Sequence, residues 1–241
     1  MHRELEEVFG EVAFDGSVAL VGAPGGRGAP GAAYAFQYGS GGLVETGKIQ
    51  VDGSSGLGAS LGLNSDMAVV GAPSTGQRVG SVFGFEYNTQ TASWERMESL
   101  VPFDSPQNGQ FGSSIAFDGT TIWVGAPGVG SSGAFYLFER DDIGHLVGAT
   151  KLASSMLADG AGFGGALVIE GDVASVELDG LGDELKVYME KGIEPLFVNF
   201  QLIGERLTVG VFGKARVVHM HVDGAGKKAF HRHVKHCLEL V

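Results

Sequence analysis

Short apolar runs separated by polar turns recur along the first 152 residues of the chain. The runs at 18–21, 67–70 and 121–124 are almost wholly apolar, as in buried inner strands. Asp-Gly at 15–16 and 118–119 favours tight hairpins, because both central residues of a type I′ turn need positive φ. A third run ending on an aromatic residue and a more polar fourth run follow each inner run. The pattern predicts three successive antiparallel units of four short strands, each about 50 residues long.

A fixed set of residues marks each of these units. Phe-Gly or Leu-Gly opens the unit, Gly-Ala-Pro ends the inner run, and another Gly begins the third run. The motif residues are Phe9, Gly10, Gly22, Ala23, Pro24, Gly58, Gly71, Ala72, Pro73, Phe111, Gly112, Gly125, Ala126 and Pro127. Three copies with matched spacing indicate a repeat architecture. We expect these residues to be structural, with the glycines allowing close backbone approach or positive φ.

The motifs resemble the FG-GAP repeat, which is found in the propellers of integrin α-subunits and in many microbial and algal surface proteins. The resemblance is clear over residues 9–152 and degenerate beyond them. It implies an all-β fold, a β-propeller of about five four-stranded blades, in a single domain over residues 1–241. The repeats are expected near 9–56, 57–110, 111–162, 163–196 and 197–241.

The last two units are degenerate. Phe163 and Gly164 open the fourth unit, but residues 177–179 depart from Gly-Ala-Pro. The fourth unit is also too short for a full fourth strand, and residues 216–222 and 230–241 are expected to complete the fifth unit.

Closure of the ring depends on how many blades form. Five blades would close it within the chain, whereas three or four would leave an open sheet edge for another subunit to cover, because open edges are templates for aggregation. The alternative is a partial propeller packed on a C-terminal antiparallel sheet over residues 165–241.

Composition supports short strands and tight turns, because the chain has 41 Gly, only 7 Pro and no Gly-X-Y period. The net charge of −12 at pH 7 disfavours general binding to nucleic acid. After residue 205, however, the chain contains seven Lys and Arg but only two acidic residues. This tail therefore carries a net charge of about +5, and the rest of the chain about −17. Six cations are expected to contact an acidic protein partner or a second copy: Lys214, Arg216, Lys227, Lys228, Arg232 and Lys235.

The compartment is not specified by the sequence. Cys237 is the only cysteine, so an intrachain disulfide is excluded. Residues 1–7 lack an apolar segment, so no signal peptide is expected, and no run is long enough to span a membrane. The resemblance, in contrast, suggests the cell surface or the extracellular space.

Calcium is the first candidate ligand, because many FG-GAP blades bind it in an Asp-rich loop between their first two strands. Calcium takes about six to eight oxygen ligands, whereas the corresponding turns in this chain hold one Asp each. We therefore expect no calcium site and no cofactor. In this respect the chain departs from the integrin-type relatives, whose adhesion depends on cations.

Histidines suggest a different metal site. His219 and His221 alternate along one predicted strand, and His231 and His233 along the next, so each pair shares a face. A hairpin through residues 222–229 would bring together four imidazoles, which suit zinc, nickel or copper. The simpler interpretation is a polar outer face that meets solvent or an acidic partner, and no metal site is favoured.

The sequence contains no Gly-x-Ser-x-Gly, P-loop or His-Glu-x-x-His motif. We therefore expect a non-catalytic protein-protein interaction or scaffolding module, such as an accessory subunit of a larger assembly, rather than an enzyme. A carbohydrate-binding or adhesion-type surface protein is the alternative, although Trp94 and Trp123 are its only tryptophans. A metal-dependent hydrolase or lyase that uses the C-terminal histidines is the third candidate.

Overall fold

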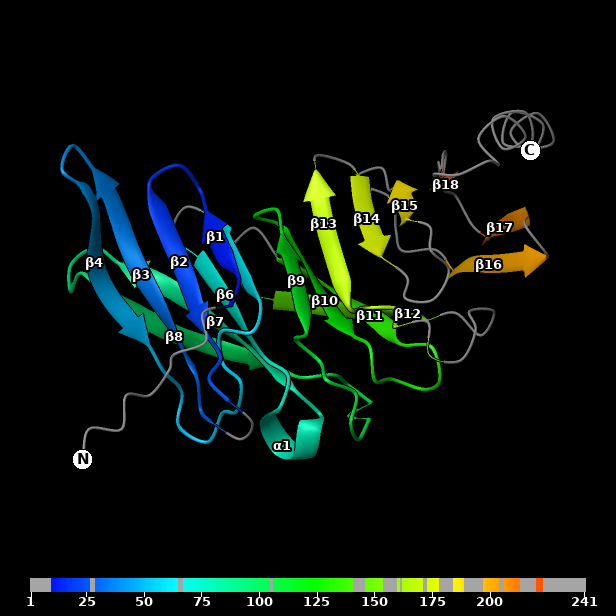
Figure 1. The fold of residues 1–241 in the computed structure, drawn as a ribbon, viewed down its shortest axis with the longest axis horizontal. Coiled ribbons are helices and arrows are strands. Elements are labelled where there is room, and N and C mark those ends of the chain that lie inside the picture. Colours follow the sequence, from blue (N-terminus) through cyan, green and yellow to red (C-terminus); the bar gives the residue numbers. More distant parts are fainter. Residues whose placement is uncertain are drawn as a thin grey trace.

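The computed structural model describes residues 10–26, 29–64, 67–104, 106–140, 146–153, 160, 162–170, 173–177, 184–188, 197–203, 206–212 and 220–222. Strands dominate this part of the chain and form five antiparallel sheets (Figure 1). Its one helical element is α1 (Thr75–Arg78), where Gly76 and Gln77 have φ values of 59° and 58°, so it is a left-handed turn rather than a regular helix. The expected all-β fold is confirmed.

Each of the first three sheets is a meander in which every strand pairs with the next one along the chain. Sheet 1 contains β1 (Val12–Phe14), β2 (Val18–Ala23), β3 (Ala32–Gly39) and β4 (Gly42–Ile49). Sheet 2 contains β5 (Leu61–Asn64), β6 (Met67–Ala72), β7 (Ser81–Asn88) and β8 (Ser93–Leu100). Sheet 3 contains β9 (Ser114–Phe117), β10 (Thr121–Ala126), β11 (Ala134–Arg140) and β12 (Leu146–Ala153). The sequence repeat is therefore a repeat of four-stranded sheets.

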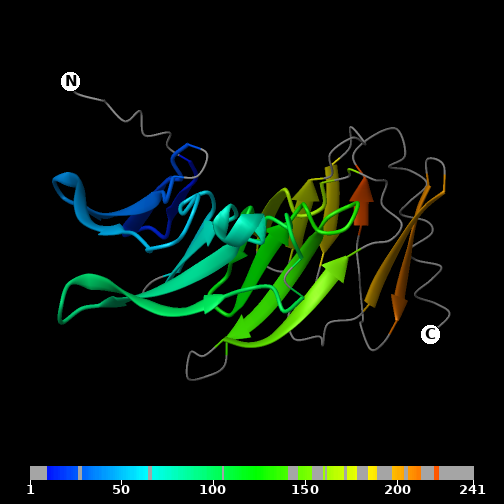
Figure 2. The same ribbon diagram turned by 90° about the horizontal axis from the view of Figure 1, so that it is seen from below.

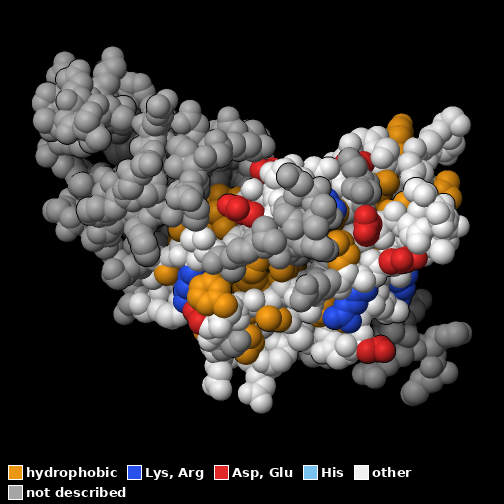
Figure 3. Space-filling view, turned by 180° about the vertical axis from the view of Figure 1, so that it is seen from behind, with side chains coloured by type: hydrophobic (Ala, Val, Ile, Leu, Met, Phe, Trp, Pro, Cys, Tyr) orange, Lys and Arg blue, Asp and Glu red, His pale blue; other side chains and the backbone are white. Residues whose placement is uncertain are grey.

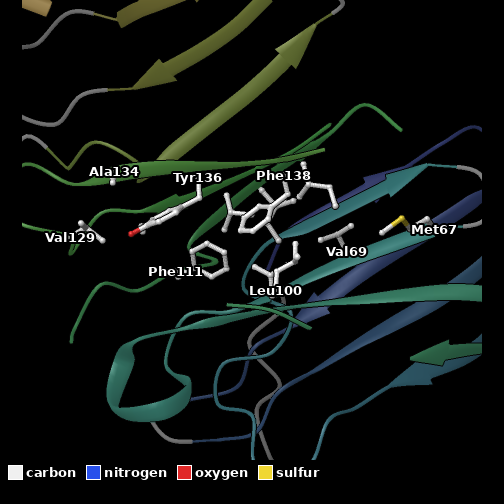
Figure 4. Close-up of a cluster of buried hydrophobic side chains, with 13 residues drawn as sticks. Met67, Val69, Leu100, Phe111, Val129, Ala134, Tyr136 and Phe138 are labelled. Atoms are coloured by element: carbon white, nitrogen blue, oxygen red, sulfur yellow. The ribbon is translucent and has the colours of Figure 1, made fainter. Parts of the chain in front are cut away.

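Hydrophobic side chains fill the spaces between sheets 1 and 2 and between sheets 2 and 3. In the second space the ring of Phe111 meets those of Tyr136 and Phe138 edge to face, with centroids 5.3 and 5.9 Å apart (Figure 4). Strand β6 is buried at every position because both faces of sheet 2 are covered. This burial on both sides explains why the inner runs are apolar throughout.

The remaining strands form a fourth sheet and a separate hairpin. Sheet 4 contains, in order, β13 (Ala166–Glu170), β14 (Val173–Glu177), β15 (Glu184–Tyr188) and β18 (Met220–Val222), while β16 (Phe197–Ile203) pairs with β17 (Arg206–Phe212). The sequence predicts residues 216–222 in the fifth unit, but β18 pairs with β15 and completes the fourth sheet. The segment 163–196 is too short for a fourth strand, so a later segment occupies that place.

The sheets stand side by side in a curved row (Figures 1 and 2). Strand β1 contacts β5, β5 contacts β9, and β9 contacts β13, so the first strands of successive sheets are neighbours. Both views place sheet 1 at one end of the row and the β16–β17 hairpin at the other. Within the described residues the arc stays open, and closure of a ring is not seen there. The described part also contains no helix with the length and apolar character needed to cross a membrane.

Candidate functional site

The glycines of the motif lie at the contacts between successive sheets. The carbonyl oxygens of Gly58, Gly112 and Gly164, at the start of sheets 2, 3 and 4, press against the Gly-Ala-Pro glycine of the preceding sheet. A Cβ on that glycine would lie 2.0 Å from the oxygen at Gly22, 2.3 Å at Gly71 and 2.0 Å at Gly125. No side chain fits at such distances, so close backbone approach is the physical requirement for glycine at these positions.

Hydrogen bonds between backbones complete each of these contacts. The N–H groups of Leu57, Phe111 and Phe163 donate to carbonyls of the preceding unit at 3.0, 2.9 and 2.8 Å. The hydroxyls of Ser60 and Ser114 donate to Gly112 and Gly164 at 2.8 and 3.0 Å. These glycines and the residues that open each unit therefore join one sheet to the next; Phe9 lies outside the described residues.

The aspartates of the hairpin turns are engaged within the turns themselves. Asp15 Oδ1 accepts hydrogen bonds from the N–H groups of Ser17 and Val18, both at 2.8 Å. Asp118 Oδ1 accepts equivalent bonds from Thr120 and Thr121, both at 2.9 Å. Desolvation raises the pKa of Asp15, but these hydrogen bonds outweigh it and leave the pKa below its usual value. A turn-capping role accounts for a single Asp at each of these hairpins.

A charged cluster on sheet 3 was not indicated by the sequence pattern. The Tyr136 hydroxyl donates to Asp104 Oδ1 at 2.7 Å, and the Lys151 ammonium forms a salt bridge with Oδ2. Desolvation and the Asp104 carboxylate both raise the pKa of Tyr136 far above its usual value. Desolvation acts in the same direction on Asp104, but hydrogen bonds from Lys151 and Tyr136 prevail and lower its pKa. Tyr136 thus stays a protonated donor, and the cluster fixes the connection after β8 to β11 and β12.

Exposed hydrophobic side chains are concentrated on sheet 1. Seven large hydrophobic side chains are exposed in the described part, and five of them belong to this sheet: Val12, Phe14, Tyr38, Leu43 and Val44, at 57–61% exposure. On the face drawn in Figure 3, hydrophobic side chains lie among acidic and basic ones. Of the five exposed residues of sheet 1, all except Val44 share one face of the sheet. Because folded proteins seldom expose apolar side chains in a group without a function, that face of sheet 1 is the candidate interaction surface.

The residues expected to bind a partner or a metal lie mostly outside the described residues: Lys214, Arg216, His219, Lys227, Lys228, His231, Arg232, His233 and Lys235. His221 lies in β18, where its backbone pairs with Lys186 of β15. No group of three or more His, Cys, Asp and Glu in the described part is placed to hold a metal ion. The basic contact surface and the histidine site remain predictions.

Comparison with known proteins bears on the family and the fold. Residues 94–138, from β8 to β11, match the family model of the FG-GAP repeat. No curated protein matches the chain. A β-propeller-like protein from Lactobacillus plantarum, solved by crystallography, has a TM-score of 0.52 and 12% sequence identity. The alignment covers 88% of this chain but 58% of that one, so the likeness concerns the fold alone. Residues 94–138 thus match the FG-GAP repeat, and the chain's row of four-stranded antiparallel sheets is similar in fold to this β-propeller-like structure.

Proposed function

We propose that this chain is a non-catalytic protein-protein interaction or scaffolding module that serves as an accessory subunit of a larger assembly. The exposed apolar side chains of sheet 1 carry the proposal, because grouped hydrophobic surface marks sites of protein contact. The FG-GAP repeat supports it further, since propeller blades present broad surfaces. The basic tail supplies a second contact region, opposite in charge to the rest of the chain.

A carbohydrate-binding role has less support. Exposed aromatic rings in loops would favour it, but Trp123 is 7% exposed within β10. Trp94 packs against Tyr87, with ring centroids 5.3 Å apart, and its indole N–H is buried. Neither tryptophan offers a flat exposed platform for a sugar ring.

Affinity capture from the native source tests the proposed function. The immobilised chain should retain a protein partner, and two variants should weaken capture by removing one contact region each. These are Leu43→Lys on sheet 1 and the double variant Lys227→Glu/Lys228→Glu in the tail. The matched control is Val101→Lys, because Val101 is 53% exposed outside sheet 1.

Three results would contradict the proposal. One is equal capture of the same proteins by wild type and by both variants. The others are retention of glycans in place of proteins, and stoichiometric zinc, nickel or copper in the purified chain by mass spectrometry. The last would favour the metal-dependent enzyme.

A further inference from the structure

Sheet 1 carries the same face that sheets 2 and 3 bury against the sheet before them. The strand registers identify equivalent residues, because Val12 pairs with Val21 as Leu61 pairs with Val70 and Ile115 with Val124. Leu61 and Ile115 are 3% and 4% exposed within the spaces between sheets. Val12, in the same place on sheet 1, is 60% exposed.

The third strands repeat this contrast. Val21 pairs with Tyr34, Val70 with Phe83, and Val124 with Tyr136, so the three aromatic residues are equivalent. Phe83 and Tyr136 are buried against the preceding sheet, whereas Tyr34 is only half-buried. Sheet 1 thus has the face that sheets 2 and 3 use to pack on the sheet before them, but no preceding sheet covers it within the described residues.

We define the open face by six residues: Val12, Phe14, Tyr34, Phe36, Tyr38 and Leu43. Phe14 and Tyr38 meet edge to face across it, with centroids 6.4 Å apart. Leu43 pairs with Tyr38, and cross-strand partners share a face. The open face therefore extends from the first strand of the sheet to the last.

Both signs of charge lie on the open face. Glu45 pairs with Phe36, and Lys48 pairs with Tyr34, with its ammonium 5.1 Å from the ring centroid. Across a two-fold axis that passes between them, Glu45 of each copy would face Lys48 of the other, which gives the charge complementarity that a symmetric dimer requires.

The opposite faces of sheets 1, 2 and 3 are already occupied. Sheet 2 covers that face of sheet 1, and sheet 3 covers that of sheet 2. On sheet 3, Phe135 is fully buried and packs against Phe163, with centroids 4.8 Å apart. In a second copy those faces of sheets 1, 2 and 3 are therefore largely covered, whereas its open face is available.

We propose that two copies of this chain pack open face to open face. The inference rests on the proposed interaction function and names the partner of sheet 1. Two twisted sheets packed in this way form a sandwich about 10 Å thick, which excludes water from Phe14, Tyr38 and Leu43. Within the chain this face of a sheet packs against the opposite face of the sheet before it, whereas in the dimer two equivalent faces would meet.

Sedimentation of Leu43→Lys and Val44→Lys tests this dimer. The two residues are adjacent and similarly exposed, at 58% and 61%, but Val44 pairs with Gln37 on the opposite face of sheet 1. Wild type and Val44→Lys should sediment as dimers. Leu43→Lys should raise the dimer dissociation constant by about 100-fold, because each dimer would bury two unpaired charges and each is expected to cost at least about tenfold.

Salt separates this contact from one made by the basic tail. An apolar contact between chains of net charge −12 should persist or strengthen between low salt and about 0.5 M, because screening weakens their repulsion. Phe14→Lys, on a different strand, should act like Leu43→Lys. Unchanged circular dichroism and melting temperature would show that both variants remain folded. If both variants instead fail to fold, hydrogen exchange of the wild type is measured at several protein concentrations. Slower exchange of β1–β4 at higher concentration would support the dimer, and exchange that does not change with concentration would overturn the inference.

A wild-type chain that remains monomeric at all concentrations would overturn the inference. So would equal dissociation of the Leu43→Lys and Val44→Lys variants. Dissociation by salt and by Lys227→Glu/Lys228→Glu alone would assign self-association to the tail. A monomer that still captures a partner through Leu43 would leave the proposed function intact and remove only the second copy.

Discussion

Gly125 shows how one backbone contact determines a residue of the motif. A Cβ there would lie 2.0 Å from the carbonyl oxygen of Gly164 and 2.2 Å from the Ser114 hydroxyl. Its φ lies outside the left-handed region, so the missing side chain, and not the backbone conformation, is what the site requires. The same requirement at Gly22 and Gly71 explains why glycine recurs at this point of each unit.

Gly125→Ala should therefore lower the free energy of unfolding by about 2–3 kcal/mol through overpacking at the contact between sheets 3 and 4. The matched control is Gly39→Ala, since nothing lies within 4 Å of a Cβ there and no positive φ is involved. Urea denaturation measures both variants. Equal midpoints for the two would contradict the steric explanation.

Glu11 links sheets 1 and 2, and its raised pKa should make the contact between them sensitive to pH. Its Oε2 accepts a hydrogen bond from the Leu61 N–H at 3.0 Å. Desolvation raises the pKa of Glu11 more than this hydrogen bond lowers it. A raised pKa means that the folded state favours the protonated carboxyl, so stability falls as pH rises from the unfolded pKa through the folded one.

Glu11→Gln should remove this dependence while retaining an oxygen acceptor for Leu61. We expect the stability of the variant relative to wild type to increase as pH rises from 4 to 7, as measured by denaturation at each pH. A difference that does not change with pH would show that Glu11 titrates alike in the folded and unfolded chain.

At the scale of the elements, the Asp104–Tyr136–Lys151 cluster ties a long connection to two strands. Tyr136→Phe removes the 2.7 Å hydrogen bond to Asp104 and should cost about 1–2 kcal/mol at neutral pH. Asp104 has a lowered pKa, so its contribution is present above its unfolded pKa and is lost as pH falls through the folded one. Tyr136→Phe should therefore cost less in acid. Tyr38→Phe, at an exposed tyrosine, serves as the control, and equal losses in both variants would contradict the assignment.

The hairpins between the first and second strands should be indifferent to calcium. Asp15 and Asp118 each use one carboxylate oxygen to cap the turn. A lone carboxylate falls well short of the about six oxygens that calcium takes, so ligand-linked stabilisation has no site there. Adding millimolar calcium should leave the melting temperature unchanged, and a rise of several degrees would disprove this expectation.

For the whole molecule, stability should follow the row of sheets. In a linear array each unit is stabilised by its neighbours, and sheet 2 is covered on both faces whereas the open face of sheet 1 is not. Amide hydrogens of β6 and β7 should therefore exchange more slowly than those of β2 and β3. The experiment uses Leu43→Lys so that the proposed dimer does not protect sheet 1. Equal protection would indicate that the sheets unfold as one cooperative unit.

Much of the fold was predictable because its determinants are local. Apolar runs with Asp-Gly turns specify hairpins within a few residues, and the spacing from Phe-Gly to Gly-Ala-Pro marks each unit. The position of β18 was not predictable in this way, because its partner β15 lies more than 30 residues earlier in the chain. The sequence of a short strand contains no local signal that specifies the distant strand with which it pairs.

The sequence by itself determined the strands, their order in the first three sheets and the repeated glycines, since turn chemistry and periodicity act between near neighbours. The tertiary structure alone decided which apolar faces are covered. Val12 and Leu61 are equivalent aliphatic residues in their units, yet one is 60% exposed and the other 3%. The difference arises because burial depends on the neighbouring sheet, and sheet 1 has none before it in the described residues. Asp104 likewise acquires its partners only when the connection after β8 folds onto β11 and β12.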